Sequence, residues 1–164
     1  MKKLVVDLEK CYSCRLEKCE AGCSYFYHTS SSGNNGIERS LAKACQYLVC
    51  RRCEDAFCIN SCPNKALERN SAGILERHSM LCTSCKSCAM ACPFGAIYEE
   101  ILPFKTSGCD WCEGRTSDDK PPYCVATCKE GALSWEVVDA DDLRRNLYIV
   151  NEHLAVKTVV WEKK

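Results

Sequence analysis

Cysteine spacing constrains this chain more than any other feature. Seventeen of the 164 residues are cysteine, and all but Cys45 fall into four groups of four. Each group opens with C-x2-C and closes with C-x3-C, and the gap between these pairs is four, four, two and eleven residues. The groups are I (Cys11, Cys14, Cys19, Cys23), II (Cys50, Cys53, Cys58, Cys62), III (Cys82, Cys85, Cys88, Cys92) and IV (Cys109, Cys112, Cys124, Cys128). Cysteine at this density decides the architecture, either as disulfides or as metal ligands.

The N-terminal sequence and the hydropathy of the chain indicate a reducing compartment, which favours metal ligation over disulfides. The N-terminus reaches the carboxylate of Asp7 after only three apolar residues, which is unlike a signal peptide. No apolar run approaches the roughly 18 residues that a membrane helix needs. Without export the compartment is reducing, and disulfide frameworks are rare there. We therefore expect a cytoplasmic protein with no direct membrane span, whose cysteines bind metal.

Groups II and III have the spacing of iron–sulfur sites. Group III has the pattern C-x2-C-x2-C-x3-C-P, which ends at Pro93 and is the run found in bacterial ferredoxins. Group II lengthens the middle gap by two residues and also ends on a proline, Pro63. A C-x2-C turn puts two thiolates on one face of a cubane, and the proline starts a short helix. Zinc is the alternative interpretation of C-x2-C pairs, above all in groups I and IV, which lack the proline.

The segments around the groups repeat. Groups II, III and IV are each followed by a small polar turn, an alanine and an alternating stretch that predicts a short strand. These stretches begin at Ala66, Ala96 and Ala132, and strands are also expected at residues 5–7 and 74–76. The repeating unit is strand, cysteine loop, short helix, strand. Four such half-units make two ferredoxin-like modules.

Two segments lie outside the repeat. In residues 37–49 the apolar positions fit one face of a helix, although an extended strand is also compatible. In the cysteine-free end, residues 139–150 could form a helix and residues 154–161 alternate as in a strand. This tail either covers the modules or docks a partner subunit.

Charge and motifs exclude several functions. Twenty-two basic residues balance 22 acidic ones, so the chain lacks the basic surface of a nucleic-acid-binding protein. No Ser/His/Asp arrangement, phosphate loop or nucleotide-cofactor fingerprint is present. If four cysteines ligate each cluster, no iron keeps an open position for a substrate. We therefore expect an electron carrier that is not catalytic by itself.

The cysteine groups resemble those of a known family. They are similar to the four-cluster [4Fe-4S] ferredoxin-like electron-transfer (beta) subunits of molybdenum and tungsten oxidoreductases, such as dimethyl sulfoxide reductase, formate dehydrogenase, hydrogenase, tungsten aldehyde oxidoreductase and benzoyl-CoA reductase complexes. The resemblance covers roughly residues 5–135. Its most specific parts are CDWC at 109–112 with PPYC before Cys128, and CRRCEDAFC followed by CP at 50–63. Group I departs from the family, because C-x2-C-x4-C replaces the commoner C-x2-C-x2-C.

The resemblance implies crossed ligation, in which the last cysteine of each group serves another group's cluster. The implied sets are cluster 1 (Cys11, Cys14, Cys19, Cys128), cluster 2 (Cys109, Cys112, Cys124, Cys23), cluster 3 (Cys50, Cys53, Cys58, Cys92) and cluster 4 (Cys82, Cys85, Cys88, Cys62). The cofactors would be four [4Fe-4S] clusters, or three if the departure in group I alters the pairing of groups I and IV. A three-iron cluster, a zinc ion or an empty site is then the alternative there.

The same resemblance implies the fold and the partner. We expect an α+β protein of two bacterial-ferredoxin-like modules, with short antiparallel strands and short helices around cubane clusters. Residues 36–103 would form one module, inserted in a second made of residues 1–35 and 104–138, with 139–164 as the tail. Single electrons would pass to or from a large catalytic subunit, a tungsten or molybdenum bis-pterin enzyme of an anaerobe, with a further donor subunit or ferredoxin. A free polyferredoxin is the alternative, and a zinc-organised interaction module is a further one.

Overall fold

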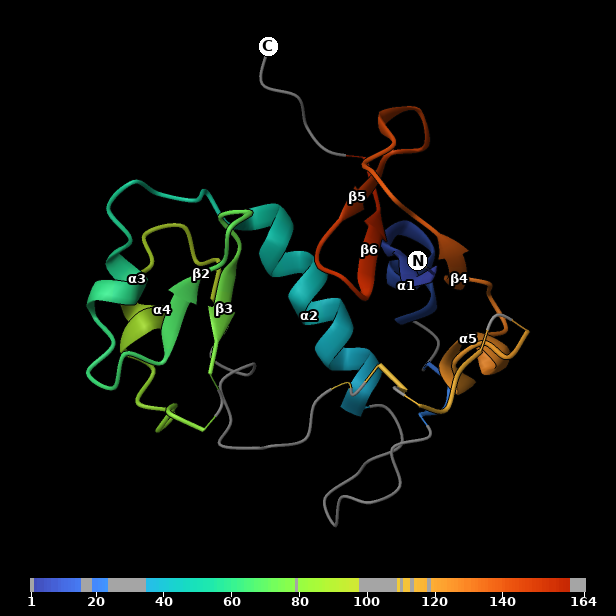
Figure 1. The fold of residues 1–164 in the computed structure, drawn as a ribbon, viewed down its shortest axis with the longest axis horizontal. Helices are drawn as coiled ribbons and strands as arrows, with labels where there is room; N and C mark the ends of the chain where they lie inside the picture. Colours follow the sequence, from blue (N-terminus) through green and yellow to red (C-terminus); the bar gives the residue numbers. More distant parts are fainter. Residues whose placement is uncertain are drawn as a thin grey trace. The chain divides into compact units, whose positions relative to one another are not determined.

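The chain forms two compact units in a computed structural model. The structure describes residues 2–15, 19–23, 35–78, 80–97, 109, 111–112, 114–117 and 119–159. Unit 1 comprises Met1–Ala44 and Ser107–Lys164, and unit 2 comprises Cys45–Thr106. Each unit is a small mixture of helices and strands (Figure 1). None of the helices in the described ranges is long and apolar enough to span a bilayer.

Unit 1 is built on a four-stranded sheet with the order β4-β1-β6-β5 (Figure 1). Strand β1 pairs antiparallel with β4 and parallel with β6, and β5 pairs antiparallel with β6. The elements of this unit are β1 (Lys2–Asp7), α1 (Leu8–Arg15), α5 (Tyr123–Thr127), β4 (Leu133–Val137), the 3-10 helix η2 (Leu143–Arg145), β5 (Leu147–Ile149) and β6 (Leu154–Lys157). The strands expected at residues 5–7 and after group IV are therefore confirmed.

The core of unit 1 follows from the central position of β1. Leu4, Val5 and Val6 are all buried, as expected for a continuous apolar run with strands on both sides. In the neighbouring strand, Leu154 and Val156 are fully buried as well. Segments far apart in the sequence, β1 and β6, thus form adjacent strands. The sheet therefore holds cysteine groups I and IV in the same unit.

The tail does not contain the expected helix. Residues 139–150 form a bridge, one 3-10 turn and strand β5 instead. The carboxylate of Asp142 accepts hydrogen bonds from the backbone N–H groups of Arg144 and Arg145, which caps this turn. Asn146 then adopts a left-handed conformation, with φ of 51°, and turns the chain into β5. The strand expected from residue 154 is confirmed as β6, although Trp161 lies outside the described residues.

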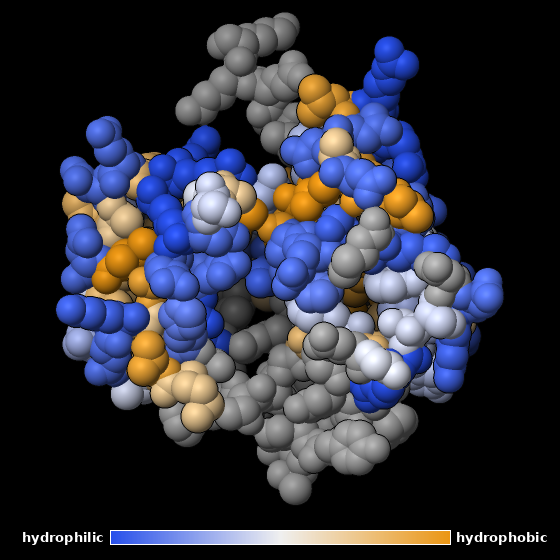
Figure 2. All heavy atoms as spheres, viewed as in Figure 1, coloured by the Kyte–Doolittle hydropathy of each residue, from blue (hydrophilic) through white to orange (hydrophobic). Residues whose placement is uncertain are grey.

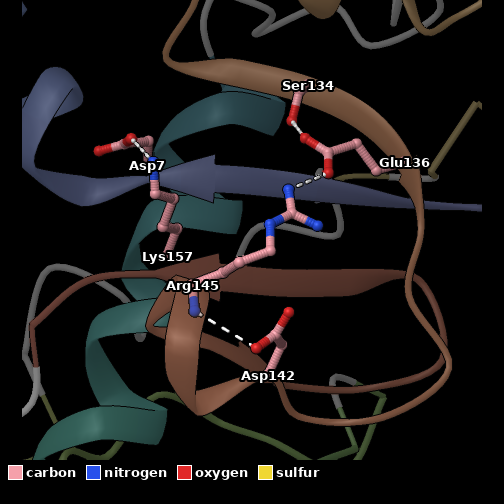
Figure 3. A network of polar contacts seen from close by, with 6 residues as sticks. All are labelled: Asp7, Ser134, Glu136, Asp142, Arg145 and Lys157. Atoms are coloured by element: carbon pink, nitrogen blue, oxygen red, sulfur yellow. Dashed lines mark hydrogen bonds and ion pairs between the residues drawn. The ribbon is translucent and has the colours of Figure 1, made fainter.

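Polar contacts link neighbouring elements of unit 1 (Figure 3). The Lys157 ammonium lies 3.1 Å from the Asp7 carboxylate and links β6 to β1. The Glu136 carboxylate accepts hydrogen bonds from the Ser134 hydroxyl and the Arg145 guanidinium, each at 2.6 Å. These two donors hold the pKa of Glu136 below its usual value. All these side chains are at least partly exposed, so water screens the pairs and their contribution to stability is small.

Helix α2 (Asn35–Val49) settles the open question about residues 37–49 in favour of a helix. The boundary between the two units falls inside it, after Ala44. Gly36, Ile37, Ser40 and Ala44 are buried at spacings of three or four residues, as expected for one helical face.

Unit 2 is a two-stranded hairpin with two very short helices. Its elements are α3 (Phe57–Asn60), β2 (Leu67–Arg69), β3 (Leu75–Arg77) and α4 (Ser87–Ala91). The hairpin turn is held by Asn70, whose side-chain oxygen accepts from the N–H groups of Ala72 and Ile74, and by Gly73 at φ of 74°. The strands expected after group II and before group III are confirmed. Ala96 and Ile97 are not in a strand, and Tyr98 lies outside the described residues.

The core of unit 2 is small. Leu67, Leu75 and Ile97 form its buried cluster, and the partly buried residues packed against it are three cysteines (Cys58, Cys62, Cys88), Ile59 and Ala89. Large apolar side chains remain exposed in this unit: Phe57, Met80, Leu81, Met90 and Phe94. Apolar residues accordingly reach the surface among hydrophilic ones (Figure 2). Unit 2 therefore needs more than side-chain burial to hold its fold.

Candidate metal centres

The first cysteine set of unit 1 joins the start of the chain to group IV. Cys11 and Cys14 lie on α1, where a spacing of three residues puts them on the same face. Burial and the nearby thiolates of Cys128, Cys19 and Cys14, in that order, raise the pKa of Cys11 to about 12. The structure thus brings together the four residues expected for cluster 1.

Contacts across more than 100 residues hold this set in place. The N–H of Gly22 donates to the Thr127 hydroxyl at 2.8 Å, and that hydroxyl donates to the Tyr123 carbonyl in the same helix. Glu20 forms an ion pair with Lys129. The segment that follows Cys19 therefore lies along α5, where group IV ends.

The second set of unit 1 surrounds a hollow of about 360 Å³, open solvent at its mouth included. Its cysteines are those expected for cluster 2: Cys23, Cys109, Cys112 and Cys124. Burial and the thiolates of Cys109, Cys112 and Cys23 raise the pKa of Cys124 to about 12. Burial also raises the pKa of Cys109, and the Ser40 hydroxyl opposes that shift by hydrogen bonding to the sulfur.

Gly36 gives this set the room it needs. A Cβ on Gly36 would lie 2.9 Å from Cys23 Sγ. We expect Gly36→Ala to displace Cys23 and to lower the iron content of the purified protein by up to about four atoms per chain. Gly22→Ala is the matched control, because its Cβ would meet only the ring of Tyr123, which is half exposed and can move away. Equal iron contents in the two variants would contradict the role given to Gly36.

The first set of unit 2 surrounds a second hollow, of about 430 Å³ with its open mouth included. Its cysteines are those expected for cluster 3: Cys50, Cys53, Cys58 and Cys92. Burial raises the pKa of Cys58, and the thiolates of Cys92 and Cys50 add to the shift. The Arg69 guanidinium donates to the Cys53 carbonyl and fixes the loop between the first two cysteines.

The second set of unit 2 is the most exposed of the four. Burial raises the pKa of Cys88, as do the thiolates of Cys62 and Cys82. These three residues therefore lie together, as expected for cluster 4. The remaining member, Cys85, is the one exposed cysteine among the seventeen, and its sulfur lies 3.4 Å from the Ser87 hydroxyl.

Three of the four C-x2-C pairs share an unusual backbone conformation. The residue before the second cysteine has a positive φ in groups II, III and IV, at Arg52, Ser84 and Trp111. Residues other than glycine rarely adopt this conformation, and it clusters at functional sites. In group I the pair lies on helix α1 instead, so the departure from the family pattern is structural as well as numerical.

The donor chemistry of the sets fits iron–sulfur clusters. The N–H groups of Ala66 and Ala96 donate to the sulfurs of Cys62 and Cys92, at 3.2 and 3.4 Å. Sulfur ligands stabilised in this way are typical of such sites. The Ser84 hydroxyl oxygen is buried with no hydrogen-bond partner in the described part of the chain. Among the described residues, no three His, Cys, Asp or Glu side chains converge as they would on a single metal ion.

Cys45, His78 and His153 do not belong to the four cysteine sets. Cys45 lies half-buried in α2. His78 Nε2 lies 2.7 Å from a carboxylate oxygen of Glu68, and the ring of His153 stacks on Trp111 with centroids 5.6 Å apart. His28 lies outside the described residues.

Sequence reasoning missed Gly36, Arg69 and Arg77. The two arginines carry one signal that could have found them, since each ends the tripeptide Leu-Glu-Arg. Gly36 carries none, because its role depends on a contact with Cys23 thirteen residues away.

Known proteins with similar sequences identify the family of this chain. Residues 43–138 match the family described as "4Fe-4S dicluster domain". The chain belongs to this family. It is 31% identical over 156 residues to the "Putative electron transport protein YsaA" of Escherichia coli (strain K12), covering 87% of this chain and 93% of the relative. Another relative is "Electron transport protein HydN" of the same strain, at 29% identity, with 79% and 85% covered.

A third relative of this 4Fe-4S dicluster protein belongs to an enzyme. It is the B subunit of the anaerobic dimethyl sulfoxide reductase of E. coli (strain K12), 36% identical over 93 residues, which cover 56% of this protein and 45% of the relative. The protein is an iron–sulfur electron-transfer protein that binds [4Fe-4S] clusters, and the predicted family is confirmed. The relatives are named as electron transport proteins or as a subunit of a reductase, which agrees with a carrier that is not itself the catalyst.

Proposed function

We propose that this protein relays single electrons through four [4Fe-4S] clusters to or from a large catalytic subunit. The clusters would be held by the four crossed sets, in which Cys128, Cys23, Cys92 and Cys62 complete the groups to which they do not belong. The partner would be a tungsten or molybdenum bis-pterin oxidoreductase of an anaerobe, working in the cytoplasm. A further donor subunit or a ferredoxin would supply or accept the electrons at the other end.

One observation carries this proposal. The last cysteine of each group lies near at least two of the first three cysteines of a different group, and this holds in both units. Two cubanes in a bacterial ferredoxin share their cysteine runs in the same crossed way. The pairing of groups I with IV and of II with III also supports two ferredoxin-like modules, one inserted in the other.

The protein's own residues would bind and insulate the clusters. When bound, each cluster supplies a site that gains or loses one electron. Burial and nearby thiolates raise the pKa of Cys11 and of Cys124 to about 12, so each of these two thiols must give up its proton as metal binds. The buried alanines Ala66, Ala96 and Ala132 would pack beside the clusters and exclude water.

The catalytic partner is inferred from relatives. One of them is the B subunit of an anaerobic dimethyl sulfoxide reductase, and this supports a stable complex with a large subunit. Two others are named only as electron transport proteins, which keeps a freely diffusing polyferredoxin as the second candidate. Purification of the tagged protein from its own cells would separate the two, since a stable partner would co-purify and a free carrier would not bring one.

The proposal is tested by counting iron and acid-labile sulfide in protein purified without oxygen. We expect about 16 of each per chain, as four cubanes require. About 12 of each would limit the protein to three clusters and contradict the four-cluster form. Zinc with little iron would overturn electron transfer altogether.

A further inference from the structure

The hairpin of unit 2 carries the same tripeptide on both strands. Strand β2 is Leu67-Glu68-Arg69 and strand β3 is Leu75-Glu76-Arg77. In their antiparallel register Leu67 pairs with Arg77 and Arg69 pairs with Leu75. The two leucines are buried among the cysteines. The hairpin therefore has an approximate two-fold symmetry, with one arginine for each cysteine set of the unit.

The two arginines donate hydrogen bonds to different kinds of atom. The Arg69 guanidinium donates to the backbone carbonyl of Cys53. The Arg77 guanidinium donates to the sulfur of Cys82, with 3.5 Å between Nη1 and Sγ. One contact holds a loop, whereas the other puts a permanent positive charge directly on a ligand atom.

A cation on a ligand sulfur favours the reduced state. A cubane with its four thiolates has a charge of about −2 when oxidised, and it gains one further negative charge on reduction. The attraction to a fixed cation grows with that charge, so Arg77 stabilises the reduced form more than the oxidised form. The step involves one electron from a low-potential donor, reduces one ferric iron to ferrous iron, and makes or breaks no bond.

The other groups around the two sets also favour a higher reduction potential at the set of Cys82 than at its neighbour. Around Cys82 and Cys85 the Ser84 and Ser87 hydroxyls add polar groups, and Cys85 is exposed. The hollow of the other set is lined mainly by apolar side chains such as Phe57, Phe94 and Ile97, although Arg51 and Arg69 line it as well. Polar donors and exposure raise the potential of such a cluster, and apolar burial lowers it.

Two further cations lie near the other set, and each contacts an aromatic ring. The Arg51 guanidinium lies 6.0 Å from the centroid of the Phe94 ring, and that of Arg52 lies 5.1 Å from the Tyr47 ring. Both arginines are exposed, so water screens their charge. Their effect on the set of Cys50 is therefore weaker than that of Arg77 on Cys82.

We propose that Arg77 raises the reduction potential of the cluster held by Cys62, Cys82, Cys85 and Cys88 above that of its neighbour in unit 2. An electron that enters this unit then rests on the side of Cys82. The inference builds on the proposed function and goes beyond it, because it names the residue that makes the two sets unequal.

The test is a redox titration of the full-length protein with dithionite, followed by electron paramagnetic resonance. We expect Arg77→Gln to lower one couple by about 59 mV, a tenfold loss of electron affinity, and to leave the other couples unchanged. That couple should be the one that Cys85→Ser also alters. Arg69→Gln is the matched control and should leave this couple in place, while Arg77→Lys, which keeps the charge, should restore part of the potential.

The outcomes separate this inference from the proposed function. If Arg77→Gln keeps its iron and sulfide but shifts no couple, or shifts the same couple as Arg69→Gln by the same amount, Arg77 has only a structural role and the inference is wrong. If Arg77→Gln loses iron, the Arg77→Lys variant decides: a potential close to that of wild type that shifts with salt concentration supports a role for the charge, and a potential that salt does not shift contradicts it. Wild-type protein without iron and sulfide would instead overturn the proposed function.

Discussion

Removal of iron should unfold unit 2 and leave the sheet of unit 1 in place. The buried aliphatic cluster of unit 2 consists of Leu67, Leu75 and Ile97, and its strands are three residues long. Such a core cannot offset the conformational entropy of its chain, so the free energy of cluster binding is also the free energy of folding. Unit 1 has a four-stranded sheet with a larger core and does not depend on metal to the same degree.

Hydrogen exchange before and after anaerobic chelation measures this difference. In the stripped protein, the amides of β2 and β3 should exchange as fast as those of an unfolded chain. The amides of β1 and β6, whose Val6 and Val156 are fully buried, should keep most of their protection. Retained protection in the hairpin, or loss of the sheet first, would show that the metal sites are not what holds unit 2 together.

Two cysteines four residues apart should serve different clusters. Cys124 lies in α5 and approaches Cys109, Cys112 and Cys23, whereas Cys128 follows that helix and approaches Cys11 and Cys14. We expect Cys128→Ala and Cys124→Ala each to remove up to about four irons per chain, but from different sites. Without crossed ligation, both substitutions would empty the same site.

Alkylation with mass spectrometry identifies the site that each variant loses. Cys128→Ala should expose Cys11, Cys14 and Cys19 to alkylation and leave Cys23 protected. Cys124→Ala should expose Cys23, Cys109 and Cys112. Cys45→Ser is the control and should keep all of its iron. Exposure of Cys109 and Cys112 in the Cys128 variant would rule out the crossed scheme.

Local patterns in the sequence predict the strands and the four cysteine groups better than the connections between them. The alternating stretches after groups II and IV form β2 and β4, because short strands depend mostly on their own apolar period. Residues 37–49 could not be assigned from the same evidence, since a short apolar pattern fits a helix and a strand alike. Burial of Gly36, Ile37 and Ser40 on one face decides for the helix.

Contacts between distant residues account for what the sequence does not reveal. The stretch 139–150 has a helical pattern, yet Leu147 and Ile149 pair with β6 and the pairing overrides the local preference. The parallel pairing of β6 with β1 joins residues about 150 positions apart, and nothing local signals it. The arginine contacts depend in the same way on the register of the hairpin, which places Arg77 within reach of Cys82.

The position of β1 in the sheet also sets the order in which the metal sites can be completed during translation. Strand β1 lies between β4 and β6, both of which leave the ribosome long after it. The ligand candidates of unit 2 all lie between residues 50 and 92, so its two sets can be filled while the rest of the chain is still being translated. In the proposed crossed sets, Cys11 and Cys23 wait for Cys128 and Cys124, respectively. During synthesis the N-terminal thiols therefore stay open the longest, and they are the ones most in need of protection from oxygen and from stray metal ions.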